Sequence, residues 1–191
     1  DVICKGADDG TITVAATGGS TNYLYKVDDG TNVTTTTDGN FTGVAPGIYT
    51  ISVIDADYPQ VEYVLPNTVT IAEPPTPLVA SAFESHKVRC KGESNGQAII
   101  NANGGWGGIM YSINGINYQG NNYFDALSVG VYVLYARDIR GCVVTDTVQI
   151  TEPAIALTGS GVESKVVTCK GGNDGEVTLT GYDGWGGYTY S

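Results

Sequence analysis

The chain has 191 residues, of which 27 are glycine and 15% are charged, and its net charge is −11. An acidic surface repels nucleic-acid phosphates, so we expect no nucleic-acid partner. No stretch of about 18 apolar residues occurs, so we expect no membrane insertion in this segment. Abundant Thr, Val, Ile, Tyr and Asn favour strands and tight turns over helices.

A motif of the form Cys-Lys-Gly-x-x-x-Gly occurs three times, beginning at Cys4, Cys90 and Cys169. The steps between the motifs are 86 and 79 residues, and a tyrosine lies 21 residues after each cysteine. A fixed order of landmarks predicts a tandem array. The predicted repeats are residues 1–74, which lack the first strand, residues 75–153, which are complete, and residues 154–191, which hold the N-terminal half.

Two of the three repeats are incomplete. Repeat one has no counterpart of residues 78–89, and repeat three covers about half of the repeat. We interpret the chain as a window on a longer array. The alternatives are arbitrarily chosen ends, or a subunit that receives its missing strand from a neighbouring chain.

Period-two alternation of apolar and polar residues predicts the strands. In each repeat a strand follows the Cys motif, and a Gly-rich turn leads to a tyrosine-bearing strand. The last strand ends at a Glu-Pro pair, because proline has no N–H to donate to the ladder. Strands are expected around residues 12–16, 23–27, 49–53 and 69–71, then 78–88, 98–102, 109–113, 132–136 and 148–150, and finally 177–179 and 188–190.

Six or seven strands in a repeat of about 80 residues indicate an all-β fold. We predict tandem immunoglobulin-like antiparallel β-sandwiches, arranged end to end because the Pro-rich links are short. Tyr49 and Tyr132 each lie two residues after a glycine, near the start of a strand. They resemble the tyrosine corner of such sandwiches, in which the hydroxyl bonds back to a nearby backbone group.

The cysteines favour an oxidising compartment. Cys90 and Cys142 both lie in the complete repeat. A disulfide between them would close a loop of roughly 50 residues and contribute about 3–4 kcal/mol. On this prediction the partner of Cys169 lies beyond residue 191, and Cys4 is free or bonds outside the chain. A zinc site is disfavoured, because there is no CxxC pair and only one histidine.

The ordered set of Cys-x-Gly-x-x-x-Gly, Gly-Gly, Tyr-Ser, Gly-x-Tyr and Gly-Cys resembles the SprB repeat family. Repeat one departs from the pattern at Lys26 and lacks the second cysteine. The resemblance implies a very large surface or secreted protein of Bacteroidetes-type bacteria, exported by the type IX route, as gliding-motility adhesins are. The matching residues are Cys90, Gly92, Gly96, Gly104, Gly105, Tyr111, Ser112, Gly130, Tyr132, Asp138, Gly141 and Cys142.

The function that follows from this resemblance is structural: a repeat segment of a long extracellular filament or adhesin at the bacterial cell surface. The expected partners are neighbouring repeats of the same chain, together with surface glycans or other filament chains.

No arrangement of residues indicates an enzyme. His86 is the only histidine, no Gly-x-Ser-x-Gly motif accompanies it, and we expect it to face solvent. We therefore expect no catalytic residue and no cofactor. The paired carboxylates favour hairpin turns, since glycine follows them. Calcium is the alternative, with Asp8, Asp9, Asp55 and Asp57 as its ligands.

Two tryptophans occupy equivalent Gly-rich loops, Trp106 in repeat two and Trp185 in repeat three. An exposed indole can stack on a sugar ring, which would make the chain a glycan-binding module of a secreted multidomain protein. The other interpretation is packing against the neighbouring repeat. Asp146-Thr147-Val148 resembles the O-glycosylation motif of Bacteroidetes, which makes Thr147 a candidate for modification.

Overall fold

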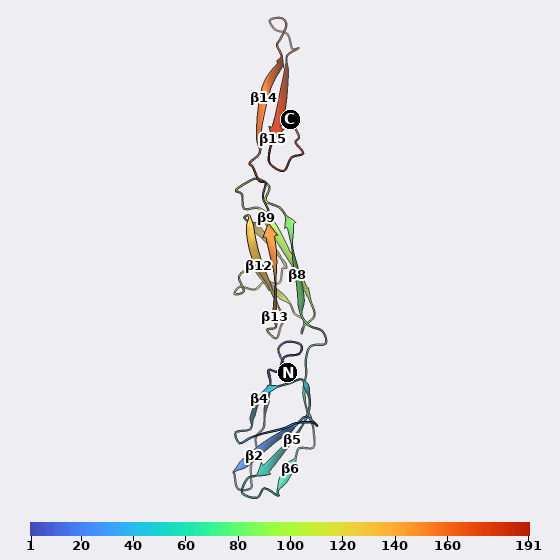
Figure 1. The fold of residues 1–191 in the computed structure, drawn as a ribbon, viewed down its shortest axis with the longest axis vertical. Coiled ribbons are helices and arrows are strands. Elements are labelled where there is room, and N and C mark those ends of the chain that lie inside the picture. Colours follow the sequence, from blue (N-terminus) through green and yellow to red (C-terminus); the bar gives the residue numbers. More distant parts are fainter. The chain divides into compact units, whose positions relative to one another are not determined.

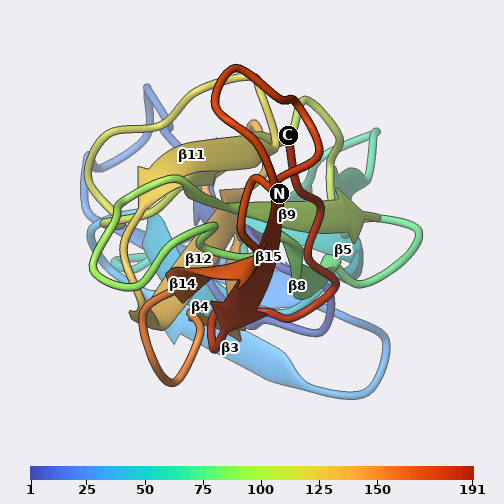
Figure 2. The same ribbon diagram turned by 90° about the horizontal axis from the view of Figure 1, so that it is seen from above.

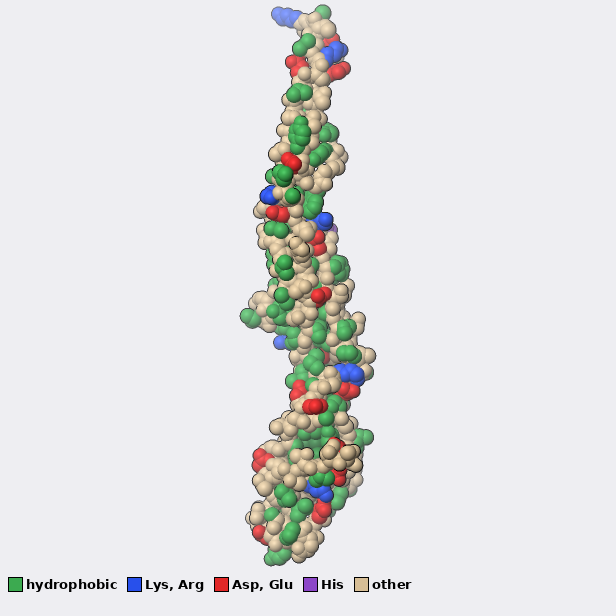
Figure 3. Space-filling model, viewed as in Figure 1, with side chains coloured by type: hydrophobic (Ala, Val, Ile, Leu, Met, Phe, Trp, Pro, Cys, Tyr) green, Lys and Arg blue, Asp and Glu red, His purple; other side chains and the backbone are tan.

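The computed structural model describes all residues from 1 to 191 and contains fifteen strands and no helix (Figure 1). The predicted all-β class is confirmed. No helical segment suited to crossing a bilayer is present. On the face shown in Figure 3, acidic and basic side chains are scattered and do not form a basic patch.

The chain folds into two compact units. The first contains Asp1–Val79, Ala102–Ile109 and Arg137–Val144. The second contains Ala80–Asn101, Met110–Ala136 and Thr145–Ser191. Three short segments of predicted repeat two, residues 75–79, 102–109 and 137–144, therefore belong to the same unit as the whole of repeat one.

The first unit packs two antiparallel sheets around one core. Its buried side chains come from both sheets, with Ile12 and Phe41 on one and Tyr25 and Ile51 on the other. Val2 lies before the first strand and completes the core. One sheet pairs β1 (Gly10–Thr13) with β4 (Asn40–Val44), and the other has the order β3 (Val33–Thr36), β2 (Tyr23–Asp28), β5 (Gly47–Asp55), β6 (Glu62–Val64), with β7 (Val69–Ile71) also paired to β5.

Repeat two forms two three-stranded sheets. Alternate residues of their strands are buried, including Ile100 and Leu134 at 0% exposure. One sheet has the order β11 (Tyr123–Leu127), β9 (Gly96–Asn103), β8 (Val79–His86), and the other has the order β10 (Met110–Ser112), β12 (Gly130–Arg137), β13 (Val143–Ile150). These strands confirm the strands predicted for this repeat.

Two carboxylates link the edge strands β8 and β13. Asp146 accepts the backbone N–H of Ala82 at 2.8 Å, and Glu84 accepts the backbone N–H of Thr151 at 2.6 Å. Both bonds satisfy donors that would otherwise be unpaired at a sheet edge. The backbone N–H groups of Ala82 and then Thr147 stabilise Asp146 in its charged form and lower the pKa of this carboxyl.

The bonds predicted for the two corner tyrosines are present. The Tyr49 hydroxyl donates to the Ala45 carbonyl at 2.8 Å, and the Tyr132 hydroxyl donates to the Ser128 carbonyl at 3.1 Å. Burial, and then the charges of Asp29 and Asp8, raise the pKa of Tyr49. Each tyrosine thus fixes the chain at the start of its strand.

Repeat three contributes one hairpin, β14 (Thr158–Lys165) with β15 (Glu176–Tyr182), which Figure 2 shows from above. Leu179 is 47% exposed, whereas its equivalent Ile100 is fully buried, because no second sheet covers the hairpin. The strand predicted at residues 188–190 is absent. That prediction was wrong because alternation alone forms no ladder without a neighbouring strand.

Candidate functional site

The first component of the site is the loop of residues 1–9, which carries Cys4 and leads into β1. Its backbone bonds to the chain just after β7, where Val2 N–H donates to the Ala72 carbonyl at 3.1 Å. Glu73 accepts from the Lys5 ammonium at 2.8 Å and from Gly6 N–H at 3.0 Å. Lys5 first, and then Gly6, lower the pKa of Glu73. The Glu-Pro landmark of the repeat therefore anchors the Cys loop.

The three Cys motifs form the same loop. In each loop a side chain five residues after the cysteine accepts the backbone N–H of the residue just before the cysteine. This contact explains why Asp or Asn precedes the second glycine of every motif. The bonds are Ile3 N to Asp9 Oδ1 at 2.9 Å, Arg89 N to Asn95 Oδ1 at 2.9 Å, and Thr168 N to Asp174 Oδ1 at 3.1 Å.

The second component is organised by Asp138, which lies at the end of β12 and is 3% exposed. Its Oδ2 accepts Trp106 N–H at 2.9 Å, and its Oδ1 accepts Arg140 N–H at 3.0 Å and Cys142 N–H at 2.9 Å. Gly105 has φ +59°, and a Cβ there would lie 2.5 Å from Asp138 Oδ2. One carboxylate thus holds both the Trp106 loop and the Cys142 loop. The Trp106 loop requires glycine at position 105 to make this contact.

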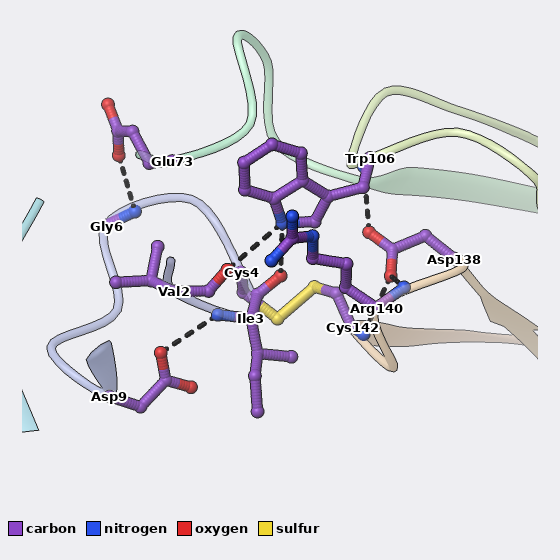
Figure 4. The surroundings of a disulfide bond; sticks show 10 residues. All are labelled: Val2, Ile3, Cys4, Gly6, Asp9, Glu73, Trp106, Asp138, Arg140 and Cys142. Atoms are coloured by element: carbon purple, nitrogen blue, oxygen red, sulfur yellow. Dashed lines mark hydrogen bonds between the residues drawn. A yellow bond between two sulfur atoms is a disulfide. The ribbon is translucent and has the colours of Figure 1, made fainter. Parts of the chain in front are cut away.

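The two components meet at a disulfide between Cys4 and Cys142, with a Cα–Cα distance of 5.1 Å (Figure 4). The Trp106 indole N–H is shared between the carbonyls of Val2 and Ile3, each at 3.1 Å. We call this arrangement the joint, formed by Asp1, Val2, Ile3, Cys4, Trp106, Asp138, Arg140 and Cys142.

A cation closes the joint on one side. The Arg140 guanidinium lies over the Trp106 ring, 4.4 Å from its centroid, and Arg140 Nη2 pairs with Asp1 Oδ2 at 2.9 Å. Stacking and ion pairing by one guanidinium suit arginine better than lysine. The indole face is therefore covered by a side chain of the same repeat.

The predicted disulfide between Cys90 and Cys142 is wrong, since Cys142 bonds to Cys4 and Cys90 is a free, exposed thiol. Strand β9 gives the reason. The Cys90 loop closes at the Gly96 end of β9, and the Asp138 contacts hold Cys142 at its Asn103 end. Eight extended residues separate the two thiols by about 20 Å. A disulfide needs Cα atoms within about 7 Å.

Part of the chain matches a known protein family. The SprB repeat model matches residues 1–32 and 163–191, which together make up about a third of the chain. This match confirms the resemblance to the SprB repeat family. Each matched stretch contains a Cys loop and the strand that follows it. No curated protein matches the chain.

Both tryptophans contact the preceding repeat. Trp106 bonds to the carbonyls of Val2 and Ile3, as described above. The Trp185 indole N–H donates to the Val88 carbonyl at 2.9 Å, and the Lys87 ammonium lies 4.5 Å from the centre of its ring. Val88 is the residue of repeat two that corresponds to Val2. These contacts agree with the packing interpretation of the two tryptophans.

The joint was missed by reasoning that paired cysteines within one repeat. The signal that could have found it is Cys4, which has no second cysteine in its own repeat. A pairing between neighbouring repeats would have given Cys4 a partner at Cys142. Nothing in the sequence marked Asp138 or Arg140 as parts of this site beyond the match of Asp138 to the family pattern.

The four carboxylates proposed as calcium ligands are not gathered at one place. No group of three or more His, Cys, Asp or Glu side chains is arranged to hold a metal ion. Asp9 closes the Cys loop instead, and Asp57 accepts the Asn22 amide at 3.2 Å. Asp55 accepts the hydroxyl and the N–H of Ser20, and these bonds lower the pKa of Asp55. Asp8 does not join the other three carboxylates in a group that could hold a metal ion.

The remaining candidates lie on β8 and β13. His86 is exposed at the end of β8. Thr147 is exposed on β13, and its backbone N–H donates to Asp146 at 2.8 Å. Thr147 stays a predicted O-glycosylation site.

Proposed function

We propose that the chain is a load-bearing stalk segment of a long filament or adhesin at the cell surface. Two findings support this. The SprB repeat family indicates a surface protein of Bacteroidetes with an adhesin-like architecture. The Cys4–Cys142 disulfide indicates an oxidising location outside the cytoplasm. Adhesion and gliding motility are the processes that such a stalk would serve.

The observation that carries the proposal is the position of this disulfide. Cys4 and Cys142 are 138 residues apart in the sequence, yet the bond joins them directly. Force applied between the two ends of the chain therefore passes through the disulfide and bypasses the segment between the cysteines. At about 3.5 Å per extended residue, the bond withholds roughly 480 Å of chain from extension. A stalk built this way resists lengthening even when its sandwiches unfold.

Single-molecule force spectroscopy on the full chain, pulled from both termini, tests the proposal. We expect the fully extended chain to be about 480 Å longer with reductant than without it, which is the length of chain that the disulfide encloses at about 3.5 Å per residue. The variant with Cys4→Ser and Cys142→Ser is the control and should extend fully under both conditions. Equal extension of the unsubstituted chain with and without reductant would contradict a load-bearing role for the bond.

A further inference from the structure

The loop that carries Cys90 is held in the same way as the loop that carries Cys4. Val88 N–H donates to the Thr151 carbonyl at 2.9 Å, as Val2 donates to Ala72. Gly92 N–H donates to Glu152 Oε2 at 2.7 Å, as Gly6 donates to Glu73. The Cys90 loop therefore shares two of the backbone anchors that place Cys4 for its disulfide.

The tryptophan of the following repeat also docks in the same way. Trp185 donates its indole N–H to Val88 at 2.9 Å, as Trp106 donates to Val2. The turn before the indole repeats as well, because Gly184 N–H donates to the Ile155 carbonyl at 3.1 Å. In repeat two the equivalent bond, from Gly105 to Thr76, is also 3.1 Å. Half of a second joint is thus already formed around Cys90.

We propose that Cys90 is the first half of a second disulfide between repeats, and that its partner is the cysteine occupying the position of Cys142 in a completed third repeat. The two thiols lose two protons and two electrons in forming the bond. A disulfide oxidant takes up both and is reduced to two thiols by thiol–disulfide exchange. This proposal about which cysteines pair is independent of the load-bearing role proposed above.

The competing partner for that cysteine is Cys169, in the same repeat. The Cys169 loop is closed by Asp174 just before β15 begins at Glu176, whereas Trp185 follows the other end of β15 at Tyr182. Seven extended residues keep the two ends about 20 Å apart. Cys169 is therefore as badly placed for a bond within its repeat as Cys90 is in repeat two.

The two disulfides would enclose overlapping stretches of chain. The first loop runs from Cys4 to Cys142, and the second would begin at Cys90, inside the first. Bridges within single repeats would instead leave the links between repeats free to extend. With staggered pairing, successive disulfide loops overlap, so the links between repeats are also prevented from extending.

An extended chain tests the pairing. Ser191 corresponds to Ser112, so a second copy of residues 113–153 placed after Ser191 completes repeat three. Lys87 lies over the Trp185 ring, in the place that the copied Arg140 would occupy. In the first joint the residue equivalent to Lys87 is Asp1, which pairs with Arg140. The extended chain therefore carries Lys87→Asp, which restores the acidic partner of the arginine.

Peptide mapping under non-reducing conditions should show Cys4 linked to Cys142 and Cys90 linked to the copied cysteine, with Cys169 as the one free thiol. The Cys4–Cys142 peptide confirms that the chain has folded. In the control, Cys90→Ser should leave two free thiols, Cys169 and the copied cysteine. A link between Cys169 and the copied cysteine in either chain would overturn the proposal. So would a free Cys90 in a chain that has formed the Cys4–Cys142 bond.

Discussion

Asp138 is the residue on which the joint depends. Its carboxylate is nearly inaccessible to solvent, and burial of a charge is unfavourable unless hydrogen bonds compensate for lost hydration. Three backbone N–H groups, from Trp106, Arg140 and Cys142, supply that compensation. Charge-assisted bonds of this kind are stronger than neutral ones. The same side chain therefore orients the indole, the guanidinium and the sulfur.

Asp138→Ala should destabilise the chain strongly, because it leaves three backbone donors without an acceptor. We expect the free energy of unfolding to fall by about 2–4 kcal/mol, as measured by urea denaturation. Asp125→Ala, at an exposed position on β11, is the matched control and should change stability by less than about 0.5 kcal/mol. Similar losses in the two variants would show that Asp138 has no special role.

Among the structural elements, the Cys loop and strand β9 determine which disulfide each thiol can form. The loop presents its cysteine at one end of a sandwich, and the strand separates that cysteine from the second one of the same repeat. Glu73 is the side chain that ties the loop to the end of β7. Since the tie relies on a carboxylate, its contribution to stability depends on pH.

Glu73→Gln should weaken the dependence of stability on pH in acid. The pKa of Glu73 is lowered in the folded chain by Lys5 and then Gly6, so its stabilising contribution is complete above the unfolded value of about 4.5. That contribution is lost as the pH falls through the lower, folded pKa. Melting temperatures measured from pH 3 to pH 7 should therefore fall less steeply below about pH 4.5 in the variant.

Glu163→Gln on β14 provides the comparison for this experiment, since Glu163 is exposed. Its melting curve should follow that of the unsubstituted chain at every pH. If Glu73→Gln gave the same acid profile as Glu163→Gln, the contact between Glu73 and the Cys loop would not contribute to stability.

At the scale of the whole molecule, one covalent bond connects residues that the sequence places in different repeats. The Cys4–Cys142 bond encloses most of repeat one and most of repeat two in a single loop. A disulfide stabilises mainly by restricting the unfolded chain, and the restriction grows with loop length. The long loop makes this bond more stabilising than a bond within one repeat would be.

The double variant with Cys4→Ser and Cys142→Ser should unfold at a lower urea concentration. For a loop of 138 residues the entropic estimate is about 5 kcal/mol. The control replaces the two exposed thiols, Cys90→Ser and Cys169→Ser, and should leave the midpoint unchanged. Equal midpoints for the two double variants would contradict a stabilising role for the bond.

The sequence by itself determined what depends on neighbours along the chain. Alternation predicted most strands of repeats one and two, although it missed β3, β4, β6 and β11. The glycine two residues before Tyr49 and Tyr132 indicated the corner bonds, and the repeated motif predicted a tandem array. Each of these features is decided within a few residues by backbone conformation and side-chain period. The composition favoured strands over helices, and the number of predicted strands indicated the all-β class.

Only the tertiary structure decided which distant groups meet. The pairing of Cys4 with Cys142, the dispersal of the four candidate calcium ligands and the missing strand at residues 188–190 all depend on contacts between remote segments. The length of β9 excluded the bond within repeat two, and Asp138 directed Cys142 toward Cys4 instead. Distances across a sandwich depend on how strands pack, and a one-dimensional pattern contains no such distance.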